Sequence, residues 1–542
     1  MRSKILFSAL LAALLVACTT VTVPTTFVPS ANTDDIRRDV NYLASAELAG
    51  RDTGSEGYRK AAQYVAEQFE RMGLAPAGDQ GYFQDVPFRS ASWNGSEPSF
   101  VLKGKSGNVS FSFGEEFIAG PSAVSERSSL EADLVFVGYG IEAPEYNLND
   151  YAGLNVQGKV AVILSGRPES LPSEVGAHYA SSRNKRETAA RHGAVGYITV
   201  YTPEREKRRP FARYAEHRHD DTFDWVNREG NPGSATPGLH PGVMLSSEAA
   251  GKLFVGAQRS LESIFNEIEK GQNPKGFALP YSAALSTSSK HKEVTSPNVV
   301  AVLPGSDPLL KNEYVVFSAH LDHIGKKEDG QIYYGAQDNA AGIAVMLETA
   351  RLFVESGQAP RRSLLFVAVT GEEKGLLGSD YFAEYPTVPL QSIVANINLD
   401  MPMLLYPFRD IIAFGAEHSS LGQIAERAAV HSGLKLSPDP MPEEVIFVRS
   451  DHYNFVRRGI PSIYLITGRE AQDPNIDGTA MQVAFLKESY HKPGDAPDAG
   501  VNYIAAKQFT EVNYLIAREV ADTEGRPSWY EGDFFGDLFG TN

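Results

Sequence analysis

The 542-residue chain contains one cysteine, Cys18, so no disulfide can form within it. It also lacks a basic stripe: 50 Lys and Arg stand against 67 Asp and Glu, giving a formal charge of −17 at pH 7. A nucleic-acid binder needs clustered Lys and Arg to contact phosphates. The densest basic run, residues 204–213, is short and typical of a loop. The composition therefore argues against a nucleic-acid partner.

Two catalytic signatures are absent as well. No Gly-x-Ser-x-Gly motif occurs, which disfavours a serine hydrolase. No His-Glu dipeptide occurs, which excludes a protease built on His-Glu-x-x-His. Apolar residues make up 42% and charged residues 22% of the chain, as in soluble globular proteins. The length exceeds that of one ordinary core, so two or more domains are expected.

The first 18 residues predict export. Arg2 and Lys4 precede an apolar run that is too short to span a bilayer, which is typical of a secretory signal. The run ends in Leu15-Val16-Ala17-Cys18, which resembles a bacterial lipobox. That resemblance implies cleavage before Cys18 and a lipid anchor on its sulfur; the alternative is an ordinary signal with an incidental cysteine. Thr19 in place of Asp would favour the outer membrane of a Gram-negative cell, facing the periplasm.

Acidic and imidazole side chains follow three short apolar runs that are typical of buried strands. His320 and Asp322 follow the run at 314–317, Glu372 and Glu373 that at 364–369, and Asp400 that at 393–397. In an open α/β sheet, ligands bind outside the carboxyl ends of the strands. We therefore expect an α/β domain of three layers, with a central mixed, mostly parallel sheet flanked by helices.

The residues gathered at this edge predict a metal centre rich in oxygen ligands. Asp338 lies in a loop before a helical segment, and its two carboxylate oxygens suit it to bridge two metal ions. His320 with Asp400 would complete one site, and Glu373 with His491 the other. Both sites keep open positions for a shared water, as a hydrolase needs.

Three further residues are assigned roles in catalysis. Glu372 adjoins Glu373 and is the candidate general base. Asp322 is two residues beyond His320, on the same side of an extended chain, and is expected to accept the second ring N–H of His320. Tyr490 is the candidate donor to the oxyanion. Each residue alone has an ordinary explanation as a turn former or surface residue, but together they are hard to explain without metals.

The motifs around these residues resemble those of the dinuclear zinc aminopeptidases, a family that also contains glutamate carboxypeptidases and glutaminyl cyclases. The matching stretches are residues 319–323, 335–339, 371–373, 398–401 and 490–491. The resemblance implies two Zn²⁺ ions on His320, Asp338, Glu373, Asp400 and His491, with Co²⁺ or Mn²⁺ as alternatives. It also implies a cis peptide bond between Asp338 and Asn339. Residues 450–455 resemble another family segment, in which Asp451 is expected to cap a helix.

A second resemblance concerns the middle of the chain. Residues 149–153, 158–160 and 185–194 resemble the protease-associated domain that is inserted in several secreted peptidases. The expected division is a signal peptide at 1–17, a tether at 18–32, peptidase parts at 33–125 and 291–525, an inserted β-rich domain at 126–290 and an aromatic tail at 526–542. The tail could pack over the domain or bind a partner.

The predicted function is that of a secreted metallo-aminopeptidase acting on peptide substrates. A carboxypeptidase or dipeptidase of the same family is the nearest alternative. It would need a cationic pocket, for which Arg449, Arg457, Arg458 and Arg469 are candidates. A non-catalytic receptor is disfavoured because all five ligands and Glu372 are present. The sequence predicts neither the preferred first residue nor the oligomeric state.

Overall fold

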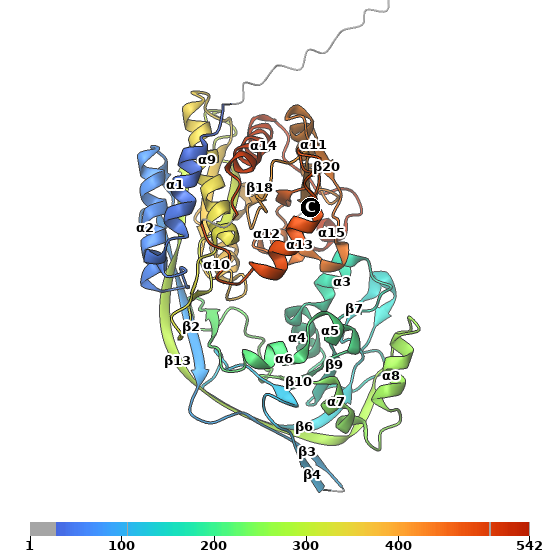
Figure 1. The fold of residues 1–542 in the computed structure, drawn as a ribbon. Coiled ribbons are helices and arrows are strands. Elements are labelled where there is room, and N and C mark those ends of the chain that lie inside the picture. The colour runs from blue at the N-terminus through green and yellow to red at the C-terminus, as the bar shows by residue number, and fades with distance from the viewer. Residues whose placement is uncertain (1–28, 106, 498–499, 541–542) are drawn as a thin grey trace, which may run out of the picture.

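The computed structural model describes residues 29–540 except 106 and 498–499. The predicted signal peptide, Cys18 and most of the predicted tether lie outside the described residues. Figure 1 shows two parts: a helix-rich part that carries the N-terminal helices and the C-terminal third of the chain, and a second part richer in strands. Strand β13, Phe277–Leu303, runs through both.

The central sheet of the helix-rich part is mixed and mostly parallel, as the sequence predicts. Strands β17 (Ser363–Val369), β14 (Tyr314–His320), β18 (Ile393–Asn398) and β21 (Ser462–Thr467) are neighbours in this order and are all parallel. The end of β13 pairs antiparallel with β17, and β19 (Asp410–Phe414) pairs antiparallel with β21 and parallel with β20 (Lys435–Ser437). The four parallel strands are almost entirely buried, because helices cover both faces.

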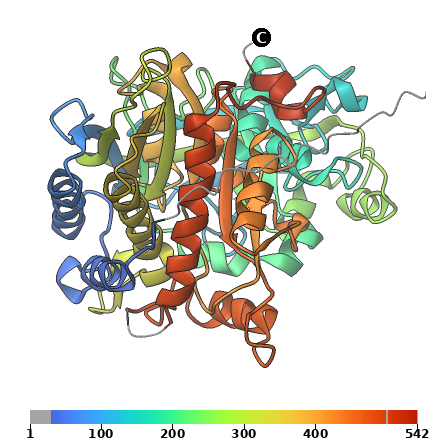
Figure 2. The ribbon, with the colours of Figure 1, turned by 90° about the horizontal axis from the view of Figure 1, so that it is seen from above.

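Helices make the outer layers. On one face, α1 (Thr33–Leu43), α2 (Glu56–Arg71), α9 (Ala341–Glu355), α11 (Leu421–His431) and α14 (Tyr503–Asp522) share one apolar core with the sheet. On the other face, α10 (Leu377–Glu384) and α12 (His452–Val456) contribute Phe382 and Phe455 to a second core. The view from above shows α14 crossing beside the sheet, with α1 and α2 at the outer side (Figure 2). This is the predicted three-layer α/β domain.

A second sheet forms the strand-rich part. The first half of β13 pairs there with β3 (Ser99–Gly104) and β6 (Arg127–Phe136), and β6 continues through β9 (Val160–Leu164) and β10 (Gly196–Val200) to β12 (Val243–Leu245). This sheet has its own apolar core. We call this part the inserted unit. It also holds β3, β4 (Gly107–Ser110) and β5 (Phe117–Ile118), so the predicted boundary between residues 125 and 126 does not match the sheets.

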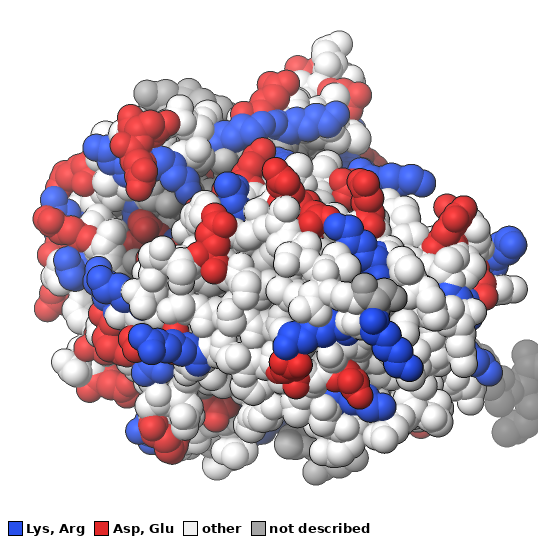
Figure 3. Space-filling model, turned by 90° about the horizontal axis from the view of Figure 1, so that it is seen from below, with Lys and Arg blue, Asp and Glu red and all other residues white. Residues whose placement is uncertain are grey.

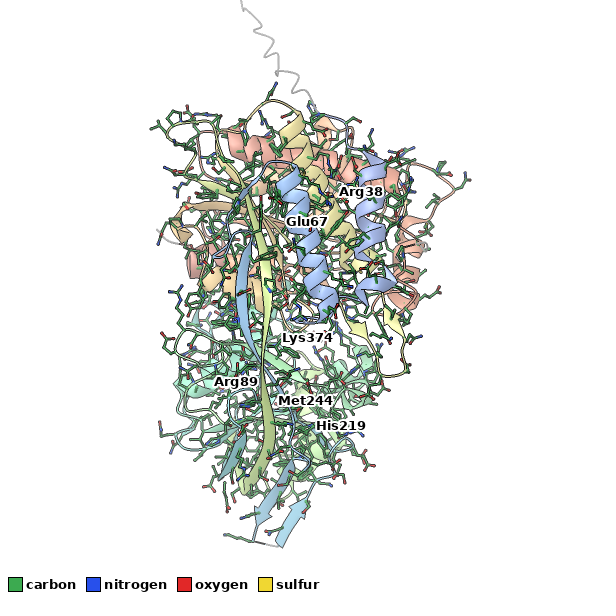
Figure 4. The ribbon with its side chains drawn as sticks, turned by 90° about the vertical axis from the view of Figure 1, so that its left-hand side faces the viewer. Arg38, Glu67, Arg89, His219, Met244 and Lys374 are labelled. Carbon is green, nitrogen blue, oxygen red and sulfur yellow. The ribbon has the colours of Figure 1, made fainter. Side chains whose placement is uncertain are left out.

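Two long strands tie the inserted unit to the rest. β2 (Phe83–Trp93) pairs with residues 289–299 of β13, and β11 (Thr222–Trp225) of the inserted unit adds to the other side of β2. Figure 4 shows both strands running without a break from beside α2 into the strand-rich part. A continuous hydrogen-bonded ladder, rather than a flexible linker, therefore fixes the position of the inserted unit.

Charged residues are distributed over the outside. On the face that Figure 3 shows, Lys and Arg side chains are interspersed with Asp and Glu. Within the described residues, no helix combines the length and the apolar character that a membrane crossing requires.

The aromatic tail packs between the two parts of the molecule. Helix α15 (Phe534–Phe539) carries Phe535, which is buried in a core with Phe447 and Tyr453 of the helix-rich part. The ring of His178 from α3 (Ser173–Ala180) of the inserted unit lies 5.5 to 6.3 Å from the rings of Phe534, Phe535 and Phe539. The tail thus joins the inserted unit to the helix-rich part, which answers the question the sequence left open.

One histidine links three segments at this junction. His418 lies beyond β19; its Nδ1 is 2.6 Å from Asp533 Oδ2 of the tail, and its Nε2 bonds Glu174 of the inserted unit. Burial lowers the pKa of His418, but the two carboxylates outweigh burial and raise it to about 10. Both ring nitrogens are engaged, so an ion-pair junction accounts for this group without a metal.

Asp533→Asn tests this junction. Asn keeps the helix cap that Asp533 provides to the N–H of Gly536 but removes the negative charge from His418. We expect the free energy of unfolding to fall by about 2 kcal/mol at neutral pH. Because the folded-state pKa of His418 lies above its usual 6.5, this stabilisation is complete below about pH 6.5 and is lost as pH rises through 10.

Urea unfolding at pH 7 and at pH 10 measures the difference. The control is Asp537→Asn, a carboxylate in the same helix with an exposed side chain. A difference between wild type and Asp533→Asn that is the same at both pH values, or that the control also shows, would contradict the account.

Candidate metal centre

The predicted ligands meet at the carboxyl edge of the parallel strands. His320 is the last residue of β14, Glu372 and Glu373 follow β17, and Asp400 follows β18. The register places His320 beside Val369 and Ser318 beside Asn398, so the three strands end at one level. Asp338 lies in the turn Ala336–Ala340 before α9, and the peptide bond between Asp338 and Asn339 is cis, as the resemblance implied.

Two groups of three donor atoms share Asp338. In the first, His320 Nε2 lies 3.1 Å from Asp338 Oδ1 and 3.0 Å from Asp400 Oδ1. In the second, His491 Nε2 lies 3.1 Å from Asp338 Oδ2 and 3.2 Å from Glu373 Oε2. The two oxygens of one carboxylate therefore face two different groups, each with one imidazole and one further carboxylate. The structure thus brings the five predicted residues together in two groups. His323 is a further candidate donor in the second group, with Nδ1 3.8 Å from Asp338 Oδ2.

The donor set fits a pair of zinc ions. In a tetrahedral site with ligands about 2.0–2.1 Å from Zn²⁺, neighbouring ligand atoms are about 3.3 Å apart. The nitrogen–oxygen separations of 3.0 to 3.2 Å are close to that edge length. All five donors except His491 have nearly buried side chains. Three protein ligands on each side leave a fourth position, the pattern of a catalytic rather than a structural site.

The electrostatics of the cluster favour cations. Burial opposes charge on Asp338, yet hydrogen bonds from His320 and His491 hold its pKa well below the usual range. Burial likewise opposes charge on His491, but Asp338 and Glu373 raise its pKa to about 10. The carboxylates thus raise the pKa of both imidazoles, which shows that positive charge at these positions is stabilised. Metal ions would supply that charge.

Glu372 stands beside the cluster without belonging to either group. It lines a cavity of about 350 Å³ together with Asp338, Asp400 and His491. Burial raises its pKa well above the usual value, and the nearby carboxylates Asp400 and Glu373 add to the shift. A carboxyl group that prefers to hold a proton, next to a metal centre, is suited to proton transfer.

Asp322 acts differently from the prediction. His320 Nδ1 donates to the backbone carbonyl of Asp322 at 3.1 Å and not to its carboxylate. The carboxylate instead accepts the backbone N–H groups of Glu372 and Glu373, at 3.1 and 3.3 Å, and the hydroxyl of Thr53 at 3.0 Å. Asp322 lies past the end of β14, so its side chain does not follow the alternation of the strand. Asp322 therefore positions the turn that carries Glu372 and Glu373.

The prediction for Asp451 is wrong. Asp451 precedes α12 but makes no side-chain hydrogen bond to the helix, and within the described residues neither of its buried carboxylate oxygens has a partner. Burial raises its pKa to about 7. The N–H groups of Tyr453 and Asn454 bond the backbone carbonyls of Ser450 and Asp451 instead.

Several supporting residues were not predicted. Asp495 accepts the backbone N–H groups of Gln337 and Asp338, at 2.9 and 3.1 Å, and so holds the bridging residue. Ser450 donates to Asp400 Oδ2 at 2.6 Å. His323 places Nδ1 2.8 Å from Glu373 Oε1. The available signal was weak: Asp495 lies four residues after His491 and His323 three residues after His320, but neither spacing by itself indicates a role.

Arg51 joins two of the loops that carry predicted metal ligands. Its buried guanidinium donates to the carbonyl of Leu321 at 2.9 Å and to that of Gly335 at 3.0 Å. These carbonyls flank His320 and the Asp338 turn. The glycine-rich connector between α1 and α2 thus joins two ligand-bearing loops.

Tyr490 lies where the prediction needs it. It lines the cavity beside Glu372, and its ring centroid is 3.9 Å from that of His491. Burial raises its pKa, and the carboxylates of the cluster raise it further, so the hydroxyl keeps its proton and remains a donor.

Comparisons with known proteins agree with this geometry. Residues 298–517, the part of the chain that carries all five donors, match the family model described as Peptidase family M28. A probable zinc metalloprotease of Pyrenophora tritici-repentis is 32% identical over 168 residues, which are 29% of this chain and 37% of that protein. A probable leucine aminopeptidase 2 of Aspergillus oryzae is 29% identical over 225 residues, 40% of this chain and 42% of that protein.

The chain thus spans less than half the length of these two relatives. Among solved structures, an aminopeptidase from Aneurinibacillus sp. strain AM-1 aligns over 92% of this chain and 95% of its own, with a TM-score of 0.52 and 20% sequence identity. That likeness covers the inserted unit as well as the helix-rich part and confirms the fold.

Asp322→Asn separates the two roles considered for Asp322. Asn offers one acceptor oxygen and an NH₂ group that would face the backbone N–H groups of Glu372 and Glu373. We expect kcat to fall about 10–100-fold while zinc content is unchanged, because Glu372 moves but His320 keeps its backbone acceptor. Steady-state kinetics with parallel metal analysis test this.

Thr53→Val is the matched control, since it removes only the hydroxyl that Asp322 accepts. It should change kcat by less than about threefold. Loss of zinc from Asp322→Asn at unchanged activity per bound ion would instead favour a role in orienting His320.

Proposed function

We propose that this chain, whose residues 298–517 match the model of Peptidase family M28, is a dinuclear zinc aminopeptidase that removes N-terminal residues from peptides. The observation that carries the proposal is the shared carboxylate of Asp338, which faces one imidazole and carboxylate pair on each side. A second carboxyl group, Glu372, lines the adjoining cavity. A single metal would need only one of the two groups.

His320, Asp338 and Asp400 would hold one Zn²⁺, and Asp338, Glu373 and His491 the other. Ions bound there would polarise the scissile carbonyl and make the attacking water more acidic. Glu372 would take the proton of that water and return it to the leaving amine, and its place on the cavity wall beside Asp338 and Asp400 supports this role. Tyr490 donates a hydrogen bond to the developing oxyanion. Asp322 keeps Glu372 in place through its backbone N–H.

The size of the cavity supports an exopeptidase. At about 350 Å³ it accommodates a few residues rather than a folded protein. Arg209 of the inserted unit lines it beside Met441 and Glu444 of the helix-rich part, so the inserted unit covers one side of the entrance. We therefore propose short peptides as substrates. The names of the two relatives, a zinc metalloprotease and a leucine aminopeptidase, agree with this class.

We further propose that the inserted unit is a protease-associated domain and that the chain is exported and lipid-anchored. The separate sheet and core of the inserted unit support the first proposal. The basic start, the apolar run and the sequence ending in Cys18 support the second. A periplasmic location on the outer membrane remains the expectation that Thr19 favours.

Glu372→Gln tests the catalytic proposal. It removes the proton acceptor at nearly constant size and touches no metal ligand atom. We expect about two zinc ions per chain in both proteins, and a fall in kcat of about 10³-fold or more on aminoacyl-nitroanilides. Elemental analysis and initial rates measure these two quantities, with Glu384→Gln on the surface as the control.

N-blocked peptides run in parallel identify the end that is cleaved. Activity on free amines only is the expected result. Cleavage of blocked peptides from their C-terminus would replace the aminopeptidase by a carboxypeptidase, and full activity of Glu372→Gln would remove Glu372 as the base.

Cys18→Ser tests the anchor in a Gram-negative host. Wild type should partition into the membrane fraction and incorporate labelled palmitate, because only the Cys18 thiol can take the lipid. The variant should incorporate no label. Equal labelling or equal fractionation of the two proteins would contradict the lipid anchor.

A further inference from the structure

Arg469 is a cation without a partner at the edge where the metal ligands gather. It stands two residues beyond Thr467, the end of the fourth parallel strand, β21. Its Nε is buried and has no hydrogen-bond partner within the described residues, and no described carboxylate oxygen lies within 4.0 Å of its nitrogens. A buried donor left unpaired is unfavourable, so the arrangement needs an explanation.

The side chain lines the same cavity as Glu372, Tyr490 and His491. Most of the wall away from the metal ligands is apolar: Met401, Met403, Phe414, Ile446, Tyr464, Ile466, Val483 and Leu486. The one acidic side chain of the lining outside the cluster and Glu372 is Glu444, and it already bonds Arg449 at 3.2 Å. No acid of the cavity wall is therefore left for Arg469.

The position of Arg469 is fixed before any ligand binds. Gln482 Nε2 donates to the carbonyls of Thr467 and Gly468, at 3.2 Å each, and the Tyr406 hydroxyl donates to the Gly468 carbonyl at 2.9 Å. Three side-chain hydrogen bonds thus hold the two residues that precede Arg469. A guanidinium on an anchored segment loses little freedom when it binds a ligand.

The other arginines considered for a carboxylate pocket are engaged elsewhere. Arg458 pairs with Glu384, and Arg457 lies 3.9 Å from Asp380, which pairs with Arg183 at 2.8 Å. These side chains line a different groove, between α10 and the inserted unit. Of the four arginines considered from sequence, Arg469 is thus the one that lines the cavity without an acid paired to it among the described residues.

We propose that Arg469 binds a carboxylate of the peptide substrate and so determines which peptides the enzyme prefers. This inference rests on the proposed function. A guanidinium and a carboxylate form paired, charge-assisted hydrogen bonds, and the apolar wall around them strengthens the interaction. The carboxylate has two possible sources in a short peptide: an acidic side chain on the N-terminal residue, or the C-terminus of a dipeptide.

Two matched pairs of substrates separate these sources. Glu-p-nitroanilide and Gln-p-nitroanilide differ only in the carboxylate of the first side chain, and Leu-Gly and Leu-Gly amide differ only in the C-terminal carboxylate. In one pair, we expect wild-type kcat/KM to favour the carboxylate member by about tenfold or more. Arg469→Gln should reduce this preference to within about twofold.

Arg458→Gln is the control, because it removes a surface guanidinium from the other groove. It should keep the wild-type preference. The absence of a preference in wild type in both pairs, or a preference that survives in Arg469→Gln, would overturn the proposal.

A binding measurement separates this inference from the proposed function. Calorimetry on zinc-loaded Glu372→Gln, with and without Arg469→Gln, gives Kd for the same four compounds without turnover. We expect the carboxylate member of one pair to bind about tenfold tighter or more, and Arg469→Gln to abolish the difference. If wild type cleaved none of the compounds, the catalytic proposal would fail, and these Kd values would still decide the role of Arg469.

Discussion

The shared carboxylate of Asp338 is the constraint on which the rest of the site depends. Its two oxygens must each face one imidazole and one other carboxylate, and these four groups come from four separate segments of the chain. Parallel strands that end at one level bring three of the loops together. Asp495 holds the Asp338 turn by accepting two of its backbone N–H groups. Arg51 donates to the carbonyl of Leu321, next to His320, and to that of Gly335, just before the turn. Concentrated negative charge at one sheet edge is stable only because cationic groups neutralise it.

The sequence predicted the ligands but not their supports, and the reason is physical. Ligands such as His320 and Asp400 follow apolar runs, and this pattern shows where strands end. Asp495 acts by accepting backbone N–H groups, and Ser450 acts by donating to the Asp400 carboxylate. No local sequence pattern indicates either contact. Asp322 was placed by the alternation of side chains along a strand, but the strand ends at His320. The Asp322 carboxylate therefore accepts the backbone N–H of Glu372, and only the Asp322 carbonyl accepts from the His320 imidazole.

The same limit applies to the larger architecture. The three-layer fold could be predicted from buried apolar runs and helical periodicity. The predicted domain boundary at residue 290, however, falls inside β13, whose 27 residues take part in both sheets. The aromatic tail packs against Phe447, and Asp533 contacts His418, two residues far away in the chain. Pairings of such long range cannot be inferred from composition. They nevertheless fix the inserted unit beside the cavity, where Arg209 forms part of the wall.

Anomalous diffraction at the zinc edge on crystals of the zinc-loaded protein tests the central claim most directly. The account predicts two peaks about 3.5–4 Å apart, one on each side of the Asp338 carboxylate. One peak would belong to the group of His320 and Asp400, and the other to that of Glu373 and His491. A single peak, or two peaks that do not share Asp338, would contradict the dinuclear centre.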